Sequence, residues 1–257
     1  MDGKNSDSGG TVSFIEHESF MGDDALRVIL IHGALDRGMA FRQVAQRLHK
    51  YTTIAYDRRG YAASLGLGAA SDPSVHVKDL LHVIDGRPAV LIGHSFGGLV
   101  AMIAAAEVPA NILALGLFES PVPWDDSVEP SPDMADRPDD PDELVEWFFR
   151  RMVGDSAWES LNDGARASLR REGPALLADM TGRRLDKVTL TPSDVMLPAV
   201  VGYGSASRQY HIDRAAQLAS ELPDAELHVI EGAQHGAHRS HPAEFAAFAE
   251  RVIARVS

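Results

Sequence analysis

The chain has 257 residues, of which 45% are hydrophobic, a length that suits one α/β domain with an insertion and is short for two independent catalytic domains. Its formal net charge of −13 repels nucleic-acid phosphates and anionic lipid surfaces, so neither is an expected partner. The chain contains no cysteine, which excludes disulfides and thiolate chemistry.

The N-terminal segment is polar. Residues 1–10 are rich in Gly, Ser and Asp and lack the basic region and apolar run of a secretory signal, so we expect a flexible tail. No apolar run reaches the roughly 18 residues that suggest a membrane span. We therefore expect a cytoplasmic protein that acts on a small-molecule substrate, without nucleic-acid or membrane partners. The sequence carries no signal for an oligomeric state.

Short β-branched and apolar runs alternate with longer helical patterns, as in the βαβ units that build a mostly parallel sheet. The expected strands are 12–18, 27–31, 52–56, 89–93, 112–118, 199–202 and 226–230. The expected helices are 39–49, 74–84, 96–107, 213–222 and 242–255. This alternation predicts the α/β class, with a mostly parallel central sheet flanked by helices.

The regular alternation stops after residue 120 and resumes near residue 198, a gap too long for an ordinary crossover connection. We interpret residues 121–197 as a helical cap inserted into a core made of residues 11–120 and 198–257. Within residues 125–146, ten acidic residues stand against Arg137 alone, so we expect this part to be exposed and mobile.

From Asp142 onward, apolar residues recur at helical spacing. The pattern predicts a helix that buries one face, and packing between cap and core is the usual role of such large apolar side chains. The other interpretation is that cap aromatics line a substrate pocket, with Trp147, Phe148 and Trp158 as the candidates.

The strongest local signal lies in residues 90–98, where an apolar strand runs through Gly93-His94-Ser95-Phe96-Gly97 into an alanine-rich helix. The serine of a G-x-S-x-G turn is held in a strained backbone conformation, and the small residues on either side let strand and helix approach closely. The turn raises the hydroxyl of Ser95 above the carboxyl end of the sheet, where open α/β sheets bind ligands. We therefore predict that Ser95 is a nucleophile.

A nucleophilic serine needs amide donors for the oxyanion that forms on its substrate. In an oxyanion hole, one amide follows the nucleophile and another comes from the loop after an earlier strand. The apolar run 28–31 ends in such a loop, His32-Gly33-Ala34. The predicted donors are therefore the N–H groups of Phe96 and Ala34.

The general base should be a histidine that follows Ser95 in the chain. Among the five that do so, His235 stands in a glycine-flanked loop directly after the strand expected at 226–230, and we predict it as the base. We expect surface or capping roles for His238 and His241. The spacing of these three histidines also suggests a metal site, but no Asp or Glu pattern accompanies them, so no metal is expected.

Several motifs stand in the order typical of one family, namely His32-Gly33, Asp57-Arg58-Arg59-Gly60, the Ser95 turn and Gly232-Ala233-Gln234-His235-Gly236. From about residue 12 to residue 256, the chain resembles the α/β-hydrolase family. The resemblance implies a serine-nucleophile hydrolase with a cap insertion and no cofactor. The charges of residues 57–60 are expected to form structural ion pairs or a turn.

The acid of the triad departs from the usual family pattern. Family members usually carry it after the strand that follows the cap, in a G-x-x-D pattern, and Gly202-Tyr203-Gly204-Ser205 places a serine there. Some members carry it instead after the strand that follows the nucleophile helix, where Glu119 ends the run 112–118. We therefore predict that Glu119 orients His235, with Ser205 as an auxiliary hydrogen-bond partner.

These residues predict cleavage of an ester, lactone or thioester bond in a small, partly apolar substrate, through an acyl-serine intermediate. The serine at position 205 keeps a second interpretation open, in which a non-hydrolytic natural-product enzyme (a cyclase or lyase) or a ligand-binding protein reuses the pocket. Haloalkane dehalogenases and epoxide hydrolases of the family use aspartate at the nucleophile position, so Ser95 disfavours those activities.

Overall fold

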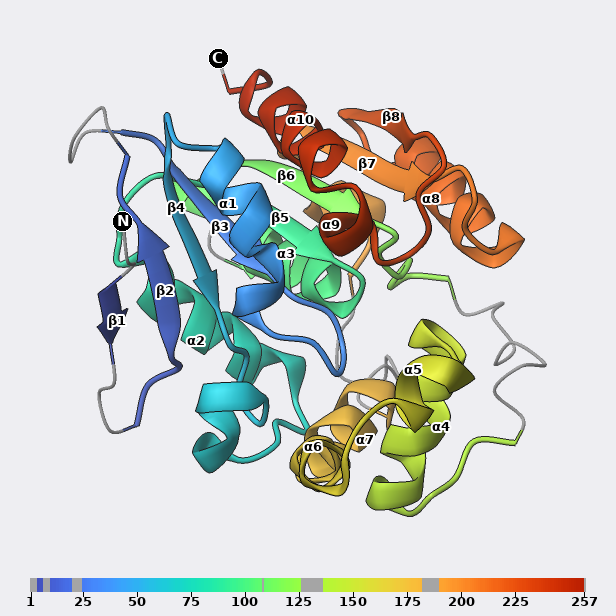
Figure 1. Cartoon of the computed structure of the whole chain (residues 1–257). Helices are drawn as coiled ribbons and strands as arrows, with labels where there is room; N and C mark the ends of the chain where they lie inside the picture. The colour runs from blue at the N-terminus through green and yellow to red at the C-terminus, as the bar shows by residue number, and fades with distance from the viewer. Residues whose placement is uncertain are drawn as a thin grey trace.

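The computed structural model describes residues 4–6, 10–19, 25–107, 109–125, 136–181 and 190–256. These residues form an eight-stranded sheet with the order β1-β2-β4-β3-β5-β6-β7-β8 (Figure 1). The strands are β1 Lys4–Ser6, β2 Phe14–His17, β3 Arg27–Ile31, β4 Thr52–Tyr56, β5 Ala89–His94, β6 Ile112–Phe118, β7 Ala199–Gly204 and β8 Ala225–Ile230. The structure thus confirms the predicted α/β class.

Strand β2 pairs antiparallel with both β1 and β4. The other neighbouring pairs in the sheet are parallel. Every residue of β3, β4 and β5 is buried, as expected for parallel strands covered on both faces. Strand β1 lies within residues 1–10, which we expected to be a flexible tail, and pairs there with β2.

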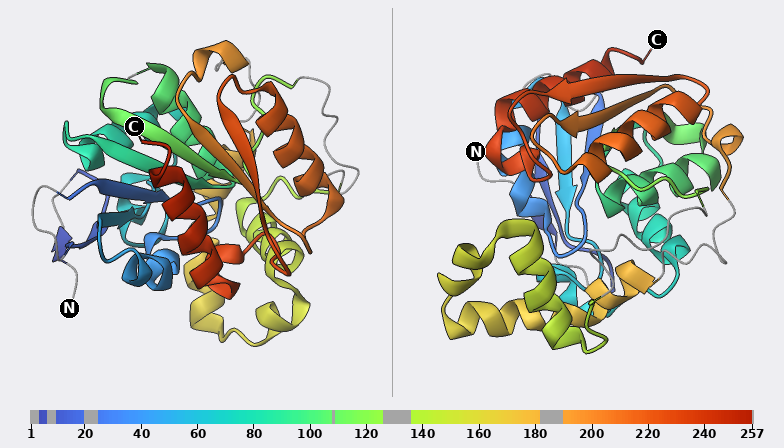
Figure 2. Two further views of the ribbon diagram at one scale, coloured as in Figure 1. Left: turned by 90° about the horizontal axis from the view of Figure 1, so that it is seen from above. Right: turned by 90° about the vertical axis from the view of Figure 1, so that its right-hand side faces the viewer.

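Helices cover both faces of the sheet (Figure 2). One face packs against α1 Arg42–Arg47, α9 Ala237–Ser240 and α10 Pro242–Ile253, and the other against α2 Pro73–Ile84, α3 Phe96–Glu107 and α8 Gln209–Glu221. Short 3₁₀ segments occupy Gly38–Phe41, Ala62–Leu67, Pro109–Asn111 and Pro192–Asp194. The helix expected at 39–49 is therefore a 3₁₀ turn followed by a short α-helix, because Phe41 at their junction has a non-helical ψ of 2°.

Four further helices form a separate group near the carboxyl ends of the parallel strands (Figures 1 and 2). They are α4 Pro141–Val153, α5 Asp155–Glu159, α6 Asp163–Arg170 and α7 Gly173–Thr181. Helix α4 begins one residue before the predicted start at Asp142, because Pro141 occupies its first turn and the Asp140 carboxylate accepts hydrogen bonds from two amides of that turn. Residues 126–135 of the acidic segment lie outside the described residues.

A buried ion pair joins this helical insertion to the core. Arg58, directly after β4, places Nη2 2.6 Å from Oδ2 of Asp179 on α7, and both side chains are at most 2% exposed. Burial opposes ionisation of Asp179, but the charge of Arg58 and the hydrogen bonds from His76 and Arg58 lower its pKa below the ordinary value. Arg58 therefore has the structural role expected for its motif.

The neighbouring charges of the same motif are also structural. Arg59 pairs with Asp79 of α2 at 2.6 Å, and the Asp57 carboxylate accepts hydrogen bonds from the amides of Gly38 and Ala63. None of the described helices is long and apolar enough to cross a membrane.

Candidate active site

The turn between β5 and α3 is sterically demanding. Ser95 has a φ of +53°, in the left-handed region that non-glycine residues rarely adopt. A Cβ on Gly93 would lie 2.4 Å from the Cα of Gly98, and one on Gly97 would lie 2.2 Å from the carbonyl oxygen of Ile31. The structure thus confirms the steric reason for glycine on both sides of the serine.

The loop after β3 lies against this turn. A Cβ on Gly33 would lie 3.0 Å from the Cβ of Ser95, so the loop that carries Ala34 passes next to the serine. Phe96 is the first residue of α3, and amides in the first turn of a helix have no intrahelical acceptor. The two amides predicted to stabilise an oxyanion therefore lie on segments that meet at Ser95.

Glu119 and His235 form the closest charged contact of the site. Nδ1 of His235, in the loop after β8, lies 2.7 Å from Oε2 of Glu119, which follows β6 and is 3% exposed. Oε1 of Glu119 accepts hydrogen bonds from the amide of Gly204, at 2.9 Å, and from the hydroxyl of Ser207. Burial opposes ionisation of Glu119, but the hydrogen bond and charge of His235, the amide of Gly204 and the charge of His211 lower its pKa below the ordinary value. Glu119 is therefore a carboxylate at neutral pH.

Ser205 does not have the partner that we expected. Its hydroxyl donates a 2.9 Å hydrogen bond to Oε2 of Glu231 and accepts one from the amide of Gly232, on the exposed side of the loop. Ser207, two residues later, turns inward and bonds Glu119. The auxiliary hydrogen bond predicted for Ser205 thus comes from Ser207, because the chain turns after β7.

His211 is a member of the site that the sequence did not reveal. Helix α8 begins at Gln209, four residues before the helix expected at 213–222, and this places His211 in its first turn. The ring of His211 stacks on that of His235, and its Nδ1 lies 3.6 Å from Oε2 of Glu119. Two imidazoles therefore face one carboxylate oxygen.

His94 connects the nucleophile turn to the base loop. Its Nε2 lies 2.8 Å from the carbonyl oxygen of His235, and the two rings lie 4.5 Å apart. The Ser95 hydroxyl makes no hydrogen bond with a residue that the structure describes, and bonds between nucleophile and base are often long before substrate binds. The adjacent contact of His94 shows that the two loops meet at the same edge of the sheet.

The three cap aromatics differ in burial. Trp158 is 1% exposed and packs within the helical insertion, where the centroid of its ring lies 5.4 Å from that of Phe149. It therefore cannot line a pocket as expected without rearrangement of the insertion. Trp147 and Phe148 are partly buried and pack against the same cluster, which also includes Ala34 of the loop after β3.

His238 is buried, so the expected surface or capping role is wrong. It is 1% exposed, and its Nε2 lies 2.9 Å from Oδ2 of Asp36. This pair was not evident from the sequence because the two residues are 202 positions apart. His241 is half-buried, and its ring bonds the neighbouring Ser240 rather than capping α10.

Among the residues that the structure describes, two groups of three side chains bring potential metal-binding atoms within 4.8 Å of one another: Asp36, His94 and His238, and Glu119, His211 and His235. In the first group, Arg239 and the amide of Arg37 already bond the Asp36 carboxylate. In the second, the rings of His211 and His235 are inclined by only 20°, so one ion cannot lie in both ring planes. The geometry therefore favours hydrogen bonding over metal binding in both groups.

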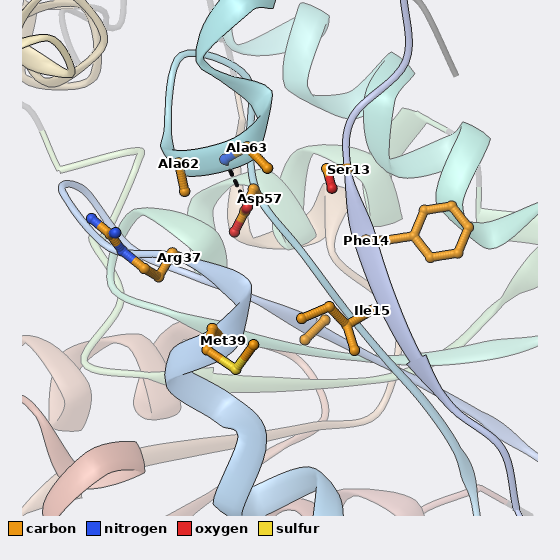
Figure 3. Close-up of a pocket in the computed structure, with 9 residues that line it drawn as sticks. Ser13, Phe14, Ile15, Arg37, Met39, Asp57, Ala62 and Ala63 are labelled. Atoms are coloured by element: carbon orange, nitrogen blue, oxygen red, sulfur yellow. Dashed lines mark hydrogen bonds between the residues drawn. The ribbon is translucent and has the colours of Figure 1, made fainter. Parts of the chain in front are cut away.

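A hollow of about 260 Å³ lies elsewhere on the core (Figure 3). Its lining residues come from β2 and the residue before it, from β4, and from the segments that follow β3 and β4: Ser13, Phe14, Ile15, Arg37, Met39, Ala55, Asp57, Ala62 and Ala63. Its carboxylate, Asp57, is bound to backbone amides, and none of the predicted catalytic residues lines the hollow. We therefore assign no catalytic role to this hollow.

Comparisons with known proteins identify the family to which this fold belongs. The profile of the alpha/beta hydrolase family matches residues 28–248. Over 236 residues the chain is 27% identical to the pimeloyl-[acyl-carrier protein] methyl ester esterase of Chromobacterium violaceum, covering 85% of this chain and 90% of the esterase. It is 25% identical over 246 residues to the 2-succinyl-6-hydroxy-2,4-cyclohexadiene-1-carboxylate synthase of an Enterobacter species, covering 88% and 91%.

A shorter match is 35% identical over 104 residues to Lipase LipV of Mycobacterium tuberculosis, and spans 39% of this chain and 40% of the lipase. Among solved structures, the N-acyl homoserine lactonase AidH in complex with N-butanoyl homoserine has the same fold, with a TM-score of 0.77. The two sequences are 20% identical, and the match covers 100% of this chain and 98% of the lactonase chain. From the matched profile, the sheet order and the turn at Ser95, we conclude that this chain belongs to the α/β hydrolase family.

Proposed function

We propose that this chain is a serine hydrolase that cleaves a carboxylic ester, lactone or thioester of a small, partly apolar molecule. The observation that carries the proposal is the 2.7 Å contact between Glu119 Oε2 and His235 Nδ1, beside the strained turn that bears Ser95. A buried carboxylate on Nδ1 fixes the imidazole tautomer whose Nε2 is free to accept a proton. Residues 121–197 are proposed as the cap over this site.

In the proposed reaction, Nε2 of His235 takes the proton of the Ser95 hydroxyl while Oγ attacks the substrate carbonyl carbon. The resulting imidazolium is stabilised by the Glu119 carboxylate, and the oxyanion by the amides of Ala34 and Phe96. His235 then returns the proton to the leaving alcohol or thiol, which departs and leaves an acyl group on Ser95. The same imidazole then takes a proton from water, whose oxygen attacks the acyl carbon. The bond to Oγ breaks, the imidazolium returns the proton to Oγ, and the acid is released from the restored serine.

The substrate class rests on the surroundings of the site. Ala34 and Leu35, in the proposed oxyanion loop, pack against the apolar cluster of the helical insertion that includes Trp147 and Phe148. An acyl or alkyl group bound beneath this insertion would therefore meet apolar side chains. The names of the related esterase and lipase support an ester substrate.

Labelling with a fluorophosphonate tests the proposal directly, since the reagent reacts only with an activated serine. We expect one adduct, located at Ser95 by peptide mass spectrometry and absent from Ser95→Ala and from heat-denatured protein. A panel of p-nitrophenyl esters of increasing acyl length then measures turnover. Native protein that acquires no adduct at Ser95 and hydrolyses no ester of the panel would refute the proposal.

A non-hydrolytic reaction is the second candidate, because the carboxylate synthase relative matches this chain over nearly its full length. Such an enzyme could use the same Ser95 and His235 for proton transfer within a bound substrate. The two candidates separate cleanly: a synthase or lyase would be labelled at Ser95 and yet release no p-nitrophenol from any ester of the panel.

A further inference from the structure

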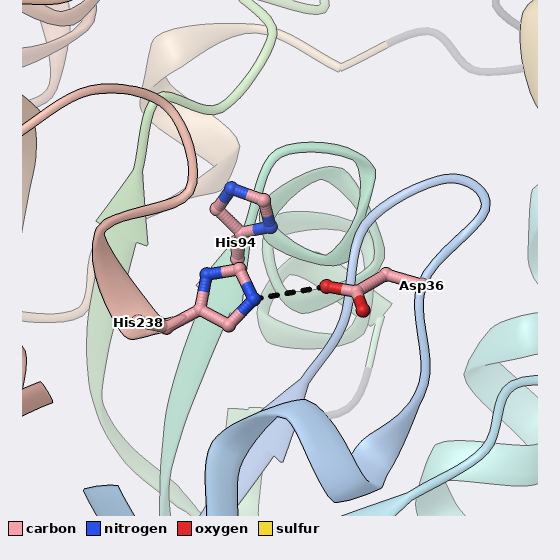
Figure 4. Close-up of side chains that lie close together, drawn as sticks. All are labelled: Asp36, His94 and His238. Carbon is pink, nitrogen blue, oxygen red and sulfur yellow. Dashed lines mark hydrogen bonds and ion pairs between the residues drawn. The ribbon is translucent and has the colours of Figure 1, made fainter. Parts of the chain in front are cut away.

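His94 lies at the end of β5, between Gly93 and the nucleophilic Ser95, and is 5% exposed. The position is the variable one in the G-x-S-x-G pattern, and the proposed reaction gives it no role. Its imidazole faces two other histidines, both from the segment that follows β8: the ring centroids of His235 and His238 each lie 4.5 Å from that of His94 (Figure 4 shows His94 and His238).

The hydrogen bond of His94 fixes its protonation. Nε2 lies 2.8 Å from the carbonyl oxygen of His235, and since a carbonyl only accepts, Nε2 must carry the proton and donate it. Burial, followed by the charges of His238 and His235, lowers the pKa of His94 well below its ordinary value. His94 is therefore a neutral donor with a single tautomer, and its Nδ1 bonds no described residue.

A second histidine, His238, also restrains the His94 ring. His238 packs against it, and its Nε2 is bound to the Asp36 carboxylate at 2.9 Å. Asp36 belongs to the loop that carries Ala34, and it also accepts hydrogen bonds from the amide of Arg37 and the guanidinium of Arg239 (Figure 4 shows the pair with His238). The imidazole of His94 thus packs between the base loop and a histidine anchored to the proposed oxyanion loop.

We propose that His94 is a positioning residue, whose Nε2–H holds the peptide carbonyl of His235 so that the base keeps its Nδ1 on Glu119 and its Nε2 toward Ser95. This inference rests on the proposed function of the triad. The carbonyl of His235 is one bond from the Cα that carries the imidazole, so a rotation of that peptide moves the ring. The contacts of the His235 ring with Glu119 and His211 restrain the edge and the face of the ring, but they do not hold the backbone of His235.

Two substitutions separate the hydrogen bond from the packing. His94→Leu fills a similar volume without a donor, whereas the amide N–H of His94→Gln can reach the position of Nε2. We expect His94→Leu to lower kcat for a p-nitrophenyl ester about 10- to 100-fold with little change in KM, because small misplacements of a catalytic group have effects of this size. His94→Gln should recover most of the loss.

Leu80→Ala serves as the control for stability alone, since Leu80 is a fully buried residue of α2 outside the site. It should lower the unfolding temperature and leave kcat unchanged. A kcat for His94→Leu equal to that of the wild type, or a His94→Gln variant no better than His94→Leu, would overturn the proposal.

A spectroscopic measurement keeps this test independent of ester turnover. The proton shared by His235 Nδ1 and Glu119 should give a strongly deshielded ¹H resonance in the wild type and in His94→Gln, absent from Glu119→Gln. We expect His94→Leu to lose or shift this resonance. If it does so while the wild type hydrolyses no ester, the positioning role stands and the proposed reaction fails; if the resonance is unchanged in a folded, active His94→Leu variant, the positioning role fails alone.

Discussion

The imidazole of His211 lies nearly parallel to that of His235, with ring centroids 4.4 Å apart and 20° between the planes. Both rings present Nδ1 to Oε2 of Glu119, at 2.7 Å for His235 and 3.6 Å for His211. The proposed base therefore shares the Glu119 carboxylate with a second titratable ring. A pH profile is the direct measure of this arrangement.

We predict that His211→Phe, which keeps an aromatic ring against His235, shifts the acid limb of kcat/KM to higher pH. The sign follows from charge. The charge of His211 is one of the causes that lower the pKa of Glu119, so without it the Glu119 carboxylate binds a proton at higher pH. An acid limb that stays in place, or moves to lower pH, would show that His211 does not act on this carboxylate.

Glu119→Gln should reduce kcat about 10³- to 10⁴-fold, the size of effect seen when a triad carboxylate is replaced by its amide. Ser207→Ala should cost only several-fold, because the amide of Gly204 still bonds Glu119. Ser205→Ala, whose hydroxyl bonds Glu231 and Gly232, is the matched control and should have no effect on kcat. Equal, small effects of all three substitutions would mean that the acid lies elsewhere.

The ion pair between Arg58 and Asp179 should be a strong determinant of stability. Asp179→Ala leaves a fully buried guanidinium without its carboxylate, and we expect a loss of about 3–5 kcal/mol in the free energy of unfolding. Replacing both residues with apolar ones, as in Arg58→Met with Asp179→Leu, should restore much of that loss. Urea denaturation of the two variants measures both effects, and a double variant less stable than Asp179→Ala would contradict this account.

Stability should fall steadily as the pH drops below neutrality. Burial, and next the charge of Arg58, lowers the pKa of His32 to about 3, and burial also lowers those of His76 and His94. Between the ordinary histidine pKa of about 6.5 and these lower values, the unfolded chain binds protons that the folded chain does not. Each such histidine then costs the fold about 1.4 kcal/mol per pH unit.

Urea denaturation at a series of pH values between 7 and 4 measures this slope. His32→Gln removes one of the buried imidazoles and should therefore flatten the curve. An unfolding free energy that is constant from pH 7 to pH 5 would contradict the prediction.

The sequence predicted most of the core because the core depends on local patterns. Strands β3, β4 and β6 and helix α3 have the expected bounds, since each is a run of buried apolar residues bounded by turn residues. The short helices α5, α6 and α7 were not resolved from the sequence, because each is too short to show a full apolar stripe.

The site was predictable where a motif carries it and not where distant segments meet. Ser95 and Glu119 directly follow their strands and His235 lies in the loop after β8, so chain position, together with the family resemblance, was enough to propose them. The partners of Glu119 were not evident: His211 depends on where α8 begins, and Ser207 on how the chain turns after β7. Asp36 and His238 likewise meet only in the folded chain.

The guanidinium of Arg58 binds both helix α7 and the loop after β3. Different regions of a substrate would touch these two parts of the protein. Besides its pairing with α7, Arg58 donates hydrogen bonds to the carbonyl oxygens of His32 and Gly33, each at 3.0 Å, immediately before Ala34. A ligand group that displaces α7 therefore also disturbs Arg58. Through Arg58 it disturbs the loop whose Ala34 amide is proposed to stabilise the oxyanion. Recognition of the remote end of a substrate and acceleration at its carbonyl would then be thermodynamically linked, so chain length should affect turnover as well as affinity.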